Sequence, residues 1–227
     1  MTEEELKEKI ALHQKWLKNE PDGIRATFSK MDLDIADFRF STDTNLQKAL
    51  FTCSSLSFAT FRKVCLRGAD FSFADLRGAY FEDADLREAN FEGANLFGVR
   101  LQGANLKGIK VSTNTQGYFL ACPSEGAFTA FKKASHDYIV VLEVPADAKR
   151  SSATTYKCRC DKAKVLRIEN LDGTPAGVNS VSSDYDPHFI YKVGETVSVN
   201  DFDDDRWHEC SSGIHFFINR KLAVLYR

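Results

Sequence analysis

Large apolar residues recur every five positions through the middle of the chain. From Ala69 to Gly108 the sequence consists of eight consecutive five-residue units with no insertion. The third residue of every unit is Leu or Phe, the first is Ala in seven of the eight, and the second is Asp or Asn in six. Five fits neither the 3.6-residue period of a helix nor the two-residue period of a strand. The segment therefore predicts a repeat architecture.

The size pattern predicts which positions face the interior. We expect the large third residue to fill the inside, the small first residue to lie beside it, and the other three to face water. The frame extends back to residue 44, and Phe28, Leu33 and Phe38 indicate an earlier partial coil. Eight residues separate Phe38 from Leu46, which predicts a three-residue insertion near 39–43. The predicted core of the main run is Leu46, Phe51, Leu56, Phe61, Leu66, Phe71, Leu76, Phe81, Leu86, Phe91, Leu96, Leu101 and Leu106.

This repeat resembles that of the pentapeptide-repeat proteins. The resemblance implies a right-handed quadrilateral β-helix with four units per coil, so core residues 20 positions apart would stack in columns of Leu or of Phe. Stacked coils are separated by the strand spacing of about 4.8 Å. We expect burial of these columns to be the main stabilising contribution.

The N-terminal segment, 1–22, predicts a helix that covers one end of the coil. Thr2 and Glu5 form a capping-box pattern, and Leu6, Ile10 and His13 fall on one helical face. A packed His13 is favoured over a ligand. The predicted domains are this helix at 1–22, the repeat coil at 23–112, and a third region at 113–227.

The third region predicts a β-rich α+β domain, which we also expect to cover the last coil. Its apolar and aromatic runs are short and are broken by Pro, Gly, Asp and Asn. The fold class is therefore mainly β. Strands are expected at 118–122, 127–132, 138–144, 155–160, 164–168, 189–193, 196–199 and 214–218, with a final helix or strand at 221–226.

The third region also resembles an uncharacterised domain of bacterial and bacteriophage pentapeptide-repeat proteins. The residues that carry this likeness include Cys122-Pro123, the run at 144–152 and the run at 209–217. The resemblance implies no known reaction.

Charge and composition argue against several classes of protein. The net charge of −2 excludes a strongly basic nucleic-acid binder, so a nucleic-acid partner is not favoured. No stretch is long and apolar enough to span a membrane. The acidic start MTEEELKEKI is not typical of a signal peptide. The six Cys residues follow no disulfide pattern, which favours free thiols in the cytoplasm.

Cysteine and histidine offer the only candidate chemistry, and it is weak. The spacing of Cys158 and Cys160 differs from that of zinc knuckles, so buried structural thiols are favoured, and no metal or cofactor is predicted. Cys210 with His208 or His215 would suit a nucleophile and base, but no acid that orients either His is identified. No catalytic residue is therefore predicted.

Two further segments carry charge. Asp201 to Asp205 lacks the Gly and Glu of a calcium loop, so a solvated acidic loop is expected. The basic stretch from Lys149 to Lys164 would suit an anion or an acidic partner. The candidate binding residues are Arg150, Arg159, Cys210 and His215.

Three functional hypotheses follow. The favoured one is a non-catalytic scaffold whose C-terminal domain binds a partner, expected to be a protein, with a link to bacteriophage suggested by the resemblance. The alternatives are a DNA mimic that inhibits a topoisomerase, and an enzyme with a Cys/His site. Residues 44–112 hold seven acidic and nine basic residues, which disfavours a DNA mimic.

Overall fold

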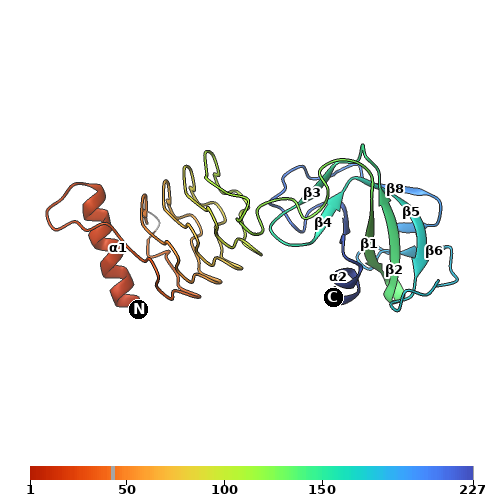
Figure 1. Cartoon of the computed structure of the whole chain (residues 1–227), viewed down its shortest axis with the longest axis horizontal. Helices are drawn as coiled ribbons and strands as arrows, with labels where there is room; N and C mark the ends of the chain where they lie inside the picture. Colours follow the sequence, from red (N-terminus) through yellow and green to blue (C-terminus); the bar gives the residue numbers. More distant parts are fainter. Residues whose placement is uncertain (42–43, 227) are drawn as a thin grey trace. The chain divides into compact units, whose positions relative to one another are not determined.

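The computed structural model describes residues 1–41 and 44–226. The chain divides into two compact units, Met1–Phe119 and Leu120–Arg227, which are described separately. Figure 1 shows the first as a helix beside stacked coils and the second as a β-rich body. Thr42 and Asp43, part of the predicted insertion, lie outside the described residues.

The first unit opens with helix α1 (Glu3–Leu17), whose capping box between Thr2 and Glu5 is formed. His13 is fully buried and makes two hydrogen bonds to the coil. Its Nδ1 accepts from the backbone N of Ala26 at 3.1 Å, and its Nε2 lies 3.1 Å from the carbonyl oxygen of Gln47. These contacts hold α1 against the first coil, and His13 is a packed residue.

The repeat region winds as a solenoid with four units per turn. Parallel bridges join residues 20 positions apart, as in Asn45 to Cys65 and Cys65 to Asp85. From Leu46 to Leu96 the backbone N–H of the large residue donates to the next coil, for example Leu46 N to Cys65 O at 2.7 Å. The first step is three residues longer, with Thr27 paired to Leu50, which matches the extra length between Phe38 and Leu46.

The interior of the solenoid is built from stacked columns. Phe51, Phe71 and Phe91 lie face to face, with ring centroids 4.7 Å and 5.2 Å apart. Rings of the neighbouring column meet them edge-on, as Phe61 does Phe71 at 82°. Of the predicted core residues, Leu106 in the last coil is half-buried and the others are buried. Each buried Leu or Phe contributes about 1.5–3 kcal/mol.

Each corner of the coil is a tight turn, and its geometry explains the residues preferred at the second and fifth positions of the unit. The N–H of Ala49 donates to Leu46 O at 3.0 Å, and Lys48, the third residue of this four-residue turn, has φ 63°. A positive φ at this position defines a type II turn and favours Gly. The Asp or Asn at the second position caps the turn, as Asp70 Oδ1 accepts from Ser72 N at 2.9 Å. That residue therefore does more than face water.

The second unit contains three sheets and a short helix. The four-stranded sheet has the order β1-β2-β5-β8, the three-stranded sheet β3-β4-β9, and the hairpin pairs β6 with β7. All named pairs are antiparallel. The bounds are β1 (Phe128–Ala134), η1 (Ser135–Asp137), β2 (Tyr138–Val144), β3 (Arg150–Ser152), β4 (Cys158–Cys160), β5 (Lys162–Glu169), β6 (Ser180–Ser182), β7 (Ile190–Lys192), β8 (Thr196–Ser198), β9 (Ile214–Phe216) and α2 (Arg220–Leu225).

The predicted strands differ from the structure at three places. The strand expected at 118–122 is absent; there the N–H of Ala121 donates to the Ser152 hydroxyl at 2.9 Å instead of to a ladder. Strands β3 and β6 were not predicted, because three-residue segments rich in Ser are too short and too polar to give a strand signal. The final segment forms helix α2, with Asn219 as its N-cap.

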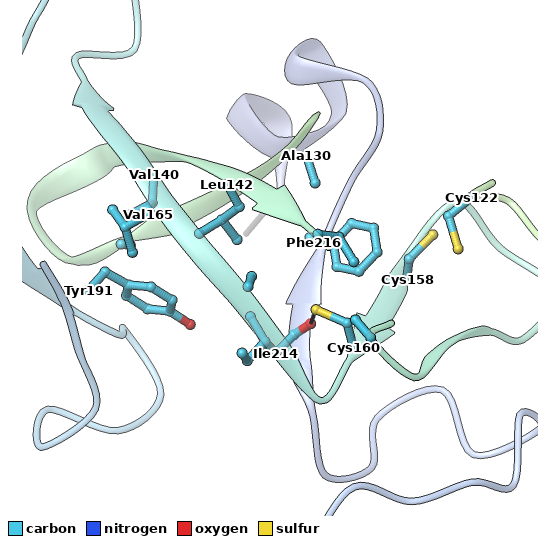
Figure 2. Packing of buried hydrophobic residues seen from close by; sticks show 14 of the residues in the cluster. Cys122, Ala130, Val140, Leu142, Cys158, Cys160, Val165, Tyr191, Ile214 and Phe216 are labelled. Carbon is cyan, nitrogen blue, oxygen red and sulfur yellow. Dashed lines mark hydrogen bonds between the residues drawn. The ribbon is translucent and has the colours of Figure 1, made fainter. Parts of the chain in front are cut away.

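Figure 2 shows the apolar core of the second unit. Val140 and Leu142 of β2 lie beside Val165 of β5, and Ile214 and Phe216 of β9 belong to the same buried cluster. The two thiols of β4, Cys158 and Cys160, also belong to it and turn inward. Because side chains alternate along a strand, the arginine between these thiols faces the opposite side of the three-stranded sheet.

Candidate functional site

Arg150 holds a turn together. Its guanidinium donates to the carbonyl oxygens of Pro145 at 2.7 Å, Ala146 at 2.8 Å and Gly126 at 2.7 Å. The group also lies over the Phe128 ring, 5.2 Å from its centroid. The turn after β2 needs these donors because its carbonyls are outside any ladder.

Arg159 of β4 binds the loop between β8 and β9 with its guanidinium. Its side chain is 1% exposed, and it donates to the carbonyl oxygens of Asp203 at 3.0 Å, Ser212 at 2.8 Å and Asp205 at 2.9 Å. Burial lowers the pKa of Arg159. The guanidinium therefore closes the loop over β4.

The acidic loop is organised internally and is not only solvated. Asp203 accepts from the Ser211 hydroxyl at 2.6 Å and lies 2.8 Å from His208 Nδ1. These contacts, with Ser211 first, hold the pKa of Asp203 well below its usual range. Asp203 is thus an acid that orients His208, which the sequence did not identify.

Cys210 lies beside a lysine. Its exposed thiol is 3.1 Å from Lys157 Nζ, which is also 3.3 Å from the Tyr226 hydroxyl. His215 instead places its Nε2 3.2 Å from the carbonyl of Glu209. Burial, followed by the charges of Lys157 and another lysine, lowers the pKa of His215 to about 4, so the imidazole is neutral near pH 7. The sequence singled out Cys210 and His215 and placed Lys157 in the basic stretch, but it missed the contact of Lys157 with Cys210 and with Tyr226.

The remaining thiols of this unit belong to the core. Burial raises the pKa of Cys160 to about 12, and contact with Cys122 and burial raise that of Cys158. Within residues 1–41 and 44–226, no group of three or more His, Cys, Asp or Glu residues is placed to hold a metal ion. No helix in the same residues is long and apolar enough to cross a membrane.

The coil carries exposed apolar residues at its corners. Ile35, Phe58 and Phe73 occupy the fifth position of their units, with φ of 58°, 59° and 58°. Their exposed fractions are 78%, 57% and 66%. We call these three residues the corner patch. Its signal was present in the sequence, because bulky apolar residues stand there where other units have Gly.

The two Phe rings of the corner patch rest on glycines of the next coil. A Cβ added at Gly78 would lie 2.6 Å from the Phe58 ring, and one added at Gly93 would lie 2.6 Å from the Phe73 ring. Phe73 comes three units after Phe58 in a coil that has four units per turn. The two rings therefore occupy adjacent corners of successive coils.

The flat faces of the coil hold charges that are paired locally. Arg77 and Arg87 bind the carboxylates two residues before them, Asp75 and Asp85. Arg62 binds Glu82 of the next coil at 2.9 Å. These pairs leave no large field of one sign on the faces that they cover.

Comparison with known families defines the class of the protein. The model for pentapeptide repeats (8 copies) matches residues 42–78 and 74–112. The chain belongs to the pentapeptide-repeat family. Residues 118–223 match a family of unknown function (DUF5758). No curated protein matches the chain.

Several solved structures are similar to part of the chain. A pentapeptide repeat protein from the Arabidopsis thaliana thylakoid lumen is 39% identical over 37% of this chain, with a TM-score of 0.35. This chain spans 57% of that structure. A pentapeptide repeat protein from Nostoc Pcc 7120 is 33% identical over 46% of this chain and 80% of its own, with a TM-score of 0.39. Full-length QnrB1, a plasmid-mediated fluoroquinolone resistance protein, is 26% identical over 40% of this chain and 67% of its own, with a TM-score of 0.17.

Proposed function

We propose that this chain is a non-catalytic interaction protein whose coil is a rigid scaffold for binding a protein partner. The observation that carries the proposal is the corner patch on the coil. A non-glycine residue in the left-handed region costs roughly 1–2 kcal/mol. Phe58 and Phe73 accept this cost while their rings remain more than half exposed.

Exposed aromatic rings on a rigid frame suit protein recognition. Binding energy at protein interfaces is concentrated in a few anchors, among which aromatic residues are enriched. The backbone ladder and the glycines beneath the rings fix Phe58 and Phe73 in place before a partner arrives. Fixed anchors lose little conformational entropy on binding.

The second unit offers another partner surface, consistent with the expectation that binding lies in residues 113–227. Tyr185 is 98% exposed at the tip of the β6–β7 hairpin, between Asp184 and Asp186. Arg150 and Arg159 shape other loops of this unit through their carbonyl contacts. We therefore propose that they support a binding surface and that Tyr185 contacts the partner.

The proposal also covers the hand of the coil, the role of α1 and the site of action. We propose that the coil is right-handed and that α1 caps its first turn through His13 and Gln14, whose Nε2 donates to Asn45 O at 2.6 Å. We propose the cytoplasm as the site of action, on the sequence grounds given above. A DNA mimic would need a strongly acidic surface, and the locally paired charges of the coil do not favour one.

The test is capture of partners from host lysate with matched variants of the full chain. Glycine suits the left-handed corners, so Phe58→Gly with Phe73→Gly removes the rings without harming the turns. A protein held by the wild type and lost with this pair supports the coil surface. A protein lost only with Tyr185→Ser places binding on the second unit. Equal capture by all three chains would contradict both surfaces.

A further inference from the structure

Lys157 is a buried cation with unusual partners. The residue is only 8% exposed, and its Nζ lies 3.1 Å from Cys210 Sγ and 3.3 Å from Tyr226 Oη. None of the ion pairs found in the described part of the chain includes Lys157. A buried ammonium requires a counter-charge or strong acceptors. The groups that lie within hydrogen-bond distance of the Lys157 ammonium are the thiol of Cys210 and the phenol of Tyr226.

The pKa of Lys157 reflects the same balance. Burial alone would lower it, but the contacts with Cys210 and then Tyr226 outweigh burial and raise it above its ordinary value. Lys157 therefore stays protonated beside the sulfur. The thiolate is the nucleophilic form of cysteine, and reactive cysteines are typically found beside a cationic side chain.

Hydrogen bonds hold the segment before Cys210 and the segment before Lys157 together. The Thr155 hydroxyl donates to the Glu209 carboxylate and accepts from the N–H of Lys157 at 3.1 Å. The carbonyl of Glu209 meets His215 Nε2 at 3.2 Å. The residue before Cys210 is thus tied to the segment that carries Lys157, while Cys210 is an exposed residue.

We propose that Cys210 is a site of reversible oxidation by hydroperoxides, formed with Lys157 and Tyr226. The thiolate sulfur attacks one peroxide oxygen, so that an S–O bond forms and the O–O bond breaks. The departing oxygen takes up a proton and leaves as water from hydrogen peroxide, or as an alcohol from an alkyl hydroperoxide. Sulfur loses two electrons, the peroxide gains them, and Cys210 becomes a sulfenic acid. A small thiol reverses the change by condensing to a mixed disulfide with loss of water, and a second thiol then releases Cys210.

Cys53 is an internal control for the rate at which Cys210 is oxidised. Cys53 is also exposed, and no side-chain hydrogen bond or ion pair of its thiol is found in the described residues. Hydrogen peroxide is added to the full chain at neutral pH, and sulfenic acid at each cysteine is trapped and counted by peptide mass spectrometry. Cys210 is expected to react at least about tenfold faster than Cys53. In denaturing urea the two rates should become equal.

Variants separate the contribution of the cation from that of exposure. Lys157→Met should bring the rate of Cys210 down toward that of Cys53, whereas Lys149→Met, which removes an exposed lysine paired with Asp204, should leave it unchanged. If Lys157→Met does not fold, Tyr226→Phe serves instead and should lower the rate about two- to fivefold, because it removes the hydroxyl that accepts a hydrogen bond from Lys157 Nζ and helps to hold this group beside the sulfur. Equal rates for Cys210 and Cys53 in the folded wild type would overturn the proposal.

Discussion

Arginine is used differently in the two units of this protein. On the coil, Arg62, Arg77 and Arg87 pair with carboxylates at the surface. In the second unit, Arg150 and Arg159 donate to backbone carbonyls of loops, and Arg159 is almost fully buried. Arg220 combines both, because it binds Glu169 and the carbonyl of Asn170.

The difference follows from how each unit satisfies its backbone. In the coil, each turn donates to the next turn, with a constant offset in sequence from residue 45 to residue 110, so the ladder itself pairs the corner and face groups. The second unit has short strands and long loops, whose carbonyls need side-chain donors. Arginine suits this task because its planar group carries five donors. Stability in the coil thus resides in apolar columns, and in the second unit also in arginines that bind loop carbonyls.

The largest effect is expected from a charge placed inside the coil. Phe71→Asp would bury a carboxylate between Phe51 and Phe91, where no partner can bind it, and should unfold the solenoid. Arg77→Asp changes an outward position and should cost less than about 1 kcal/mol. Thermal unfolding followed by circular dichroism compares the two. Equal losses in melting temperature would show that the inward and outward positions are wrongly assigned.

Removal of single arginines tests the comparison directly. Arg159→Met leaves three loop carbonyls without their donor and should lower the free energy of unfolding of the second unit by about 2–4 kcal/mol. Arg77→Met on the coil should change stability by no more than about 0.5 kcal/mol. Urea denaturation gives both values. Similar costs at the two positions would remove the distinction between the units.

Acid should weaken the second unit through His215. Its pKa is about 4 in the folded protein, below the ordinary value of 6.5, so the unfolded chain binds the proton more readily between these values. Stability is therefore complete above pH 6.5 and falls as pH drops toward 4, by up to about 3 kcal/mol. His215→Gln keeps a donor for Glu209 O and should flatten this slope. An unchanged slope would contradict the assignment.

The coil has its own acid-sensitive residue in His13. Burial lowers the pKa of His13, and its Nδ1 accepts the N–H of Ala26, so protonation would remove an acceptor. His13→Gln should reduce the acid sensitivity of the first unit and leave that of the second unchanged. Hydrogen exchange at several pH values resolves the two units by peptide. A change in residues 120–226 with this variant would show coupling that the account does not predict.

The smallest effects are expected at the corners. Lys63 has φ 61°, so Lys63→Gly should stabilise the coil by about 0.5–1 kcal/mol. Gly78→Ala should cost about 1–2 kcal/mol, from a strained φ and from the Phe58 ring 2.6 Å away. Gly108→Ala is the control, because its Cβ would meet nothing closer than 3.7 Å. If Gly78→Ala and Gly108→Ala cost the same, the ring does not rest on Gly78.

The sequence predicted the coil far better than the site. A strict period of five fixes which residue is buried, because every unit repeats the same environment, and Phe71 can be placed by counting. The role of the second-position Asp and Asn was missed, since an N–H two residues later is visible only in the turn geometry. Lys157 meets Cys210 and Tyr226 from a distant part of the sequence, and no spacing signals such contacts. Arg159 was recognised as notable, but a sequence does not reveal that its donors are used by loop carbonyls.

The central claim is that the coil binds a protein partner through the corner patch. The most direct measurement is calorimetric titration of the purified partner into the wild type and into the chain with Phe58→Gly and Phe73→Gly. Loss of two aromatic anchors should weaken binding by at least about 2 kcal/mol, or roughly 30-fold, with melting temperature preserved or raised. Unchanged affinity in a fully folded variant would contradict the claim.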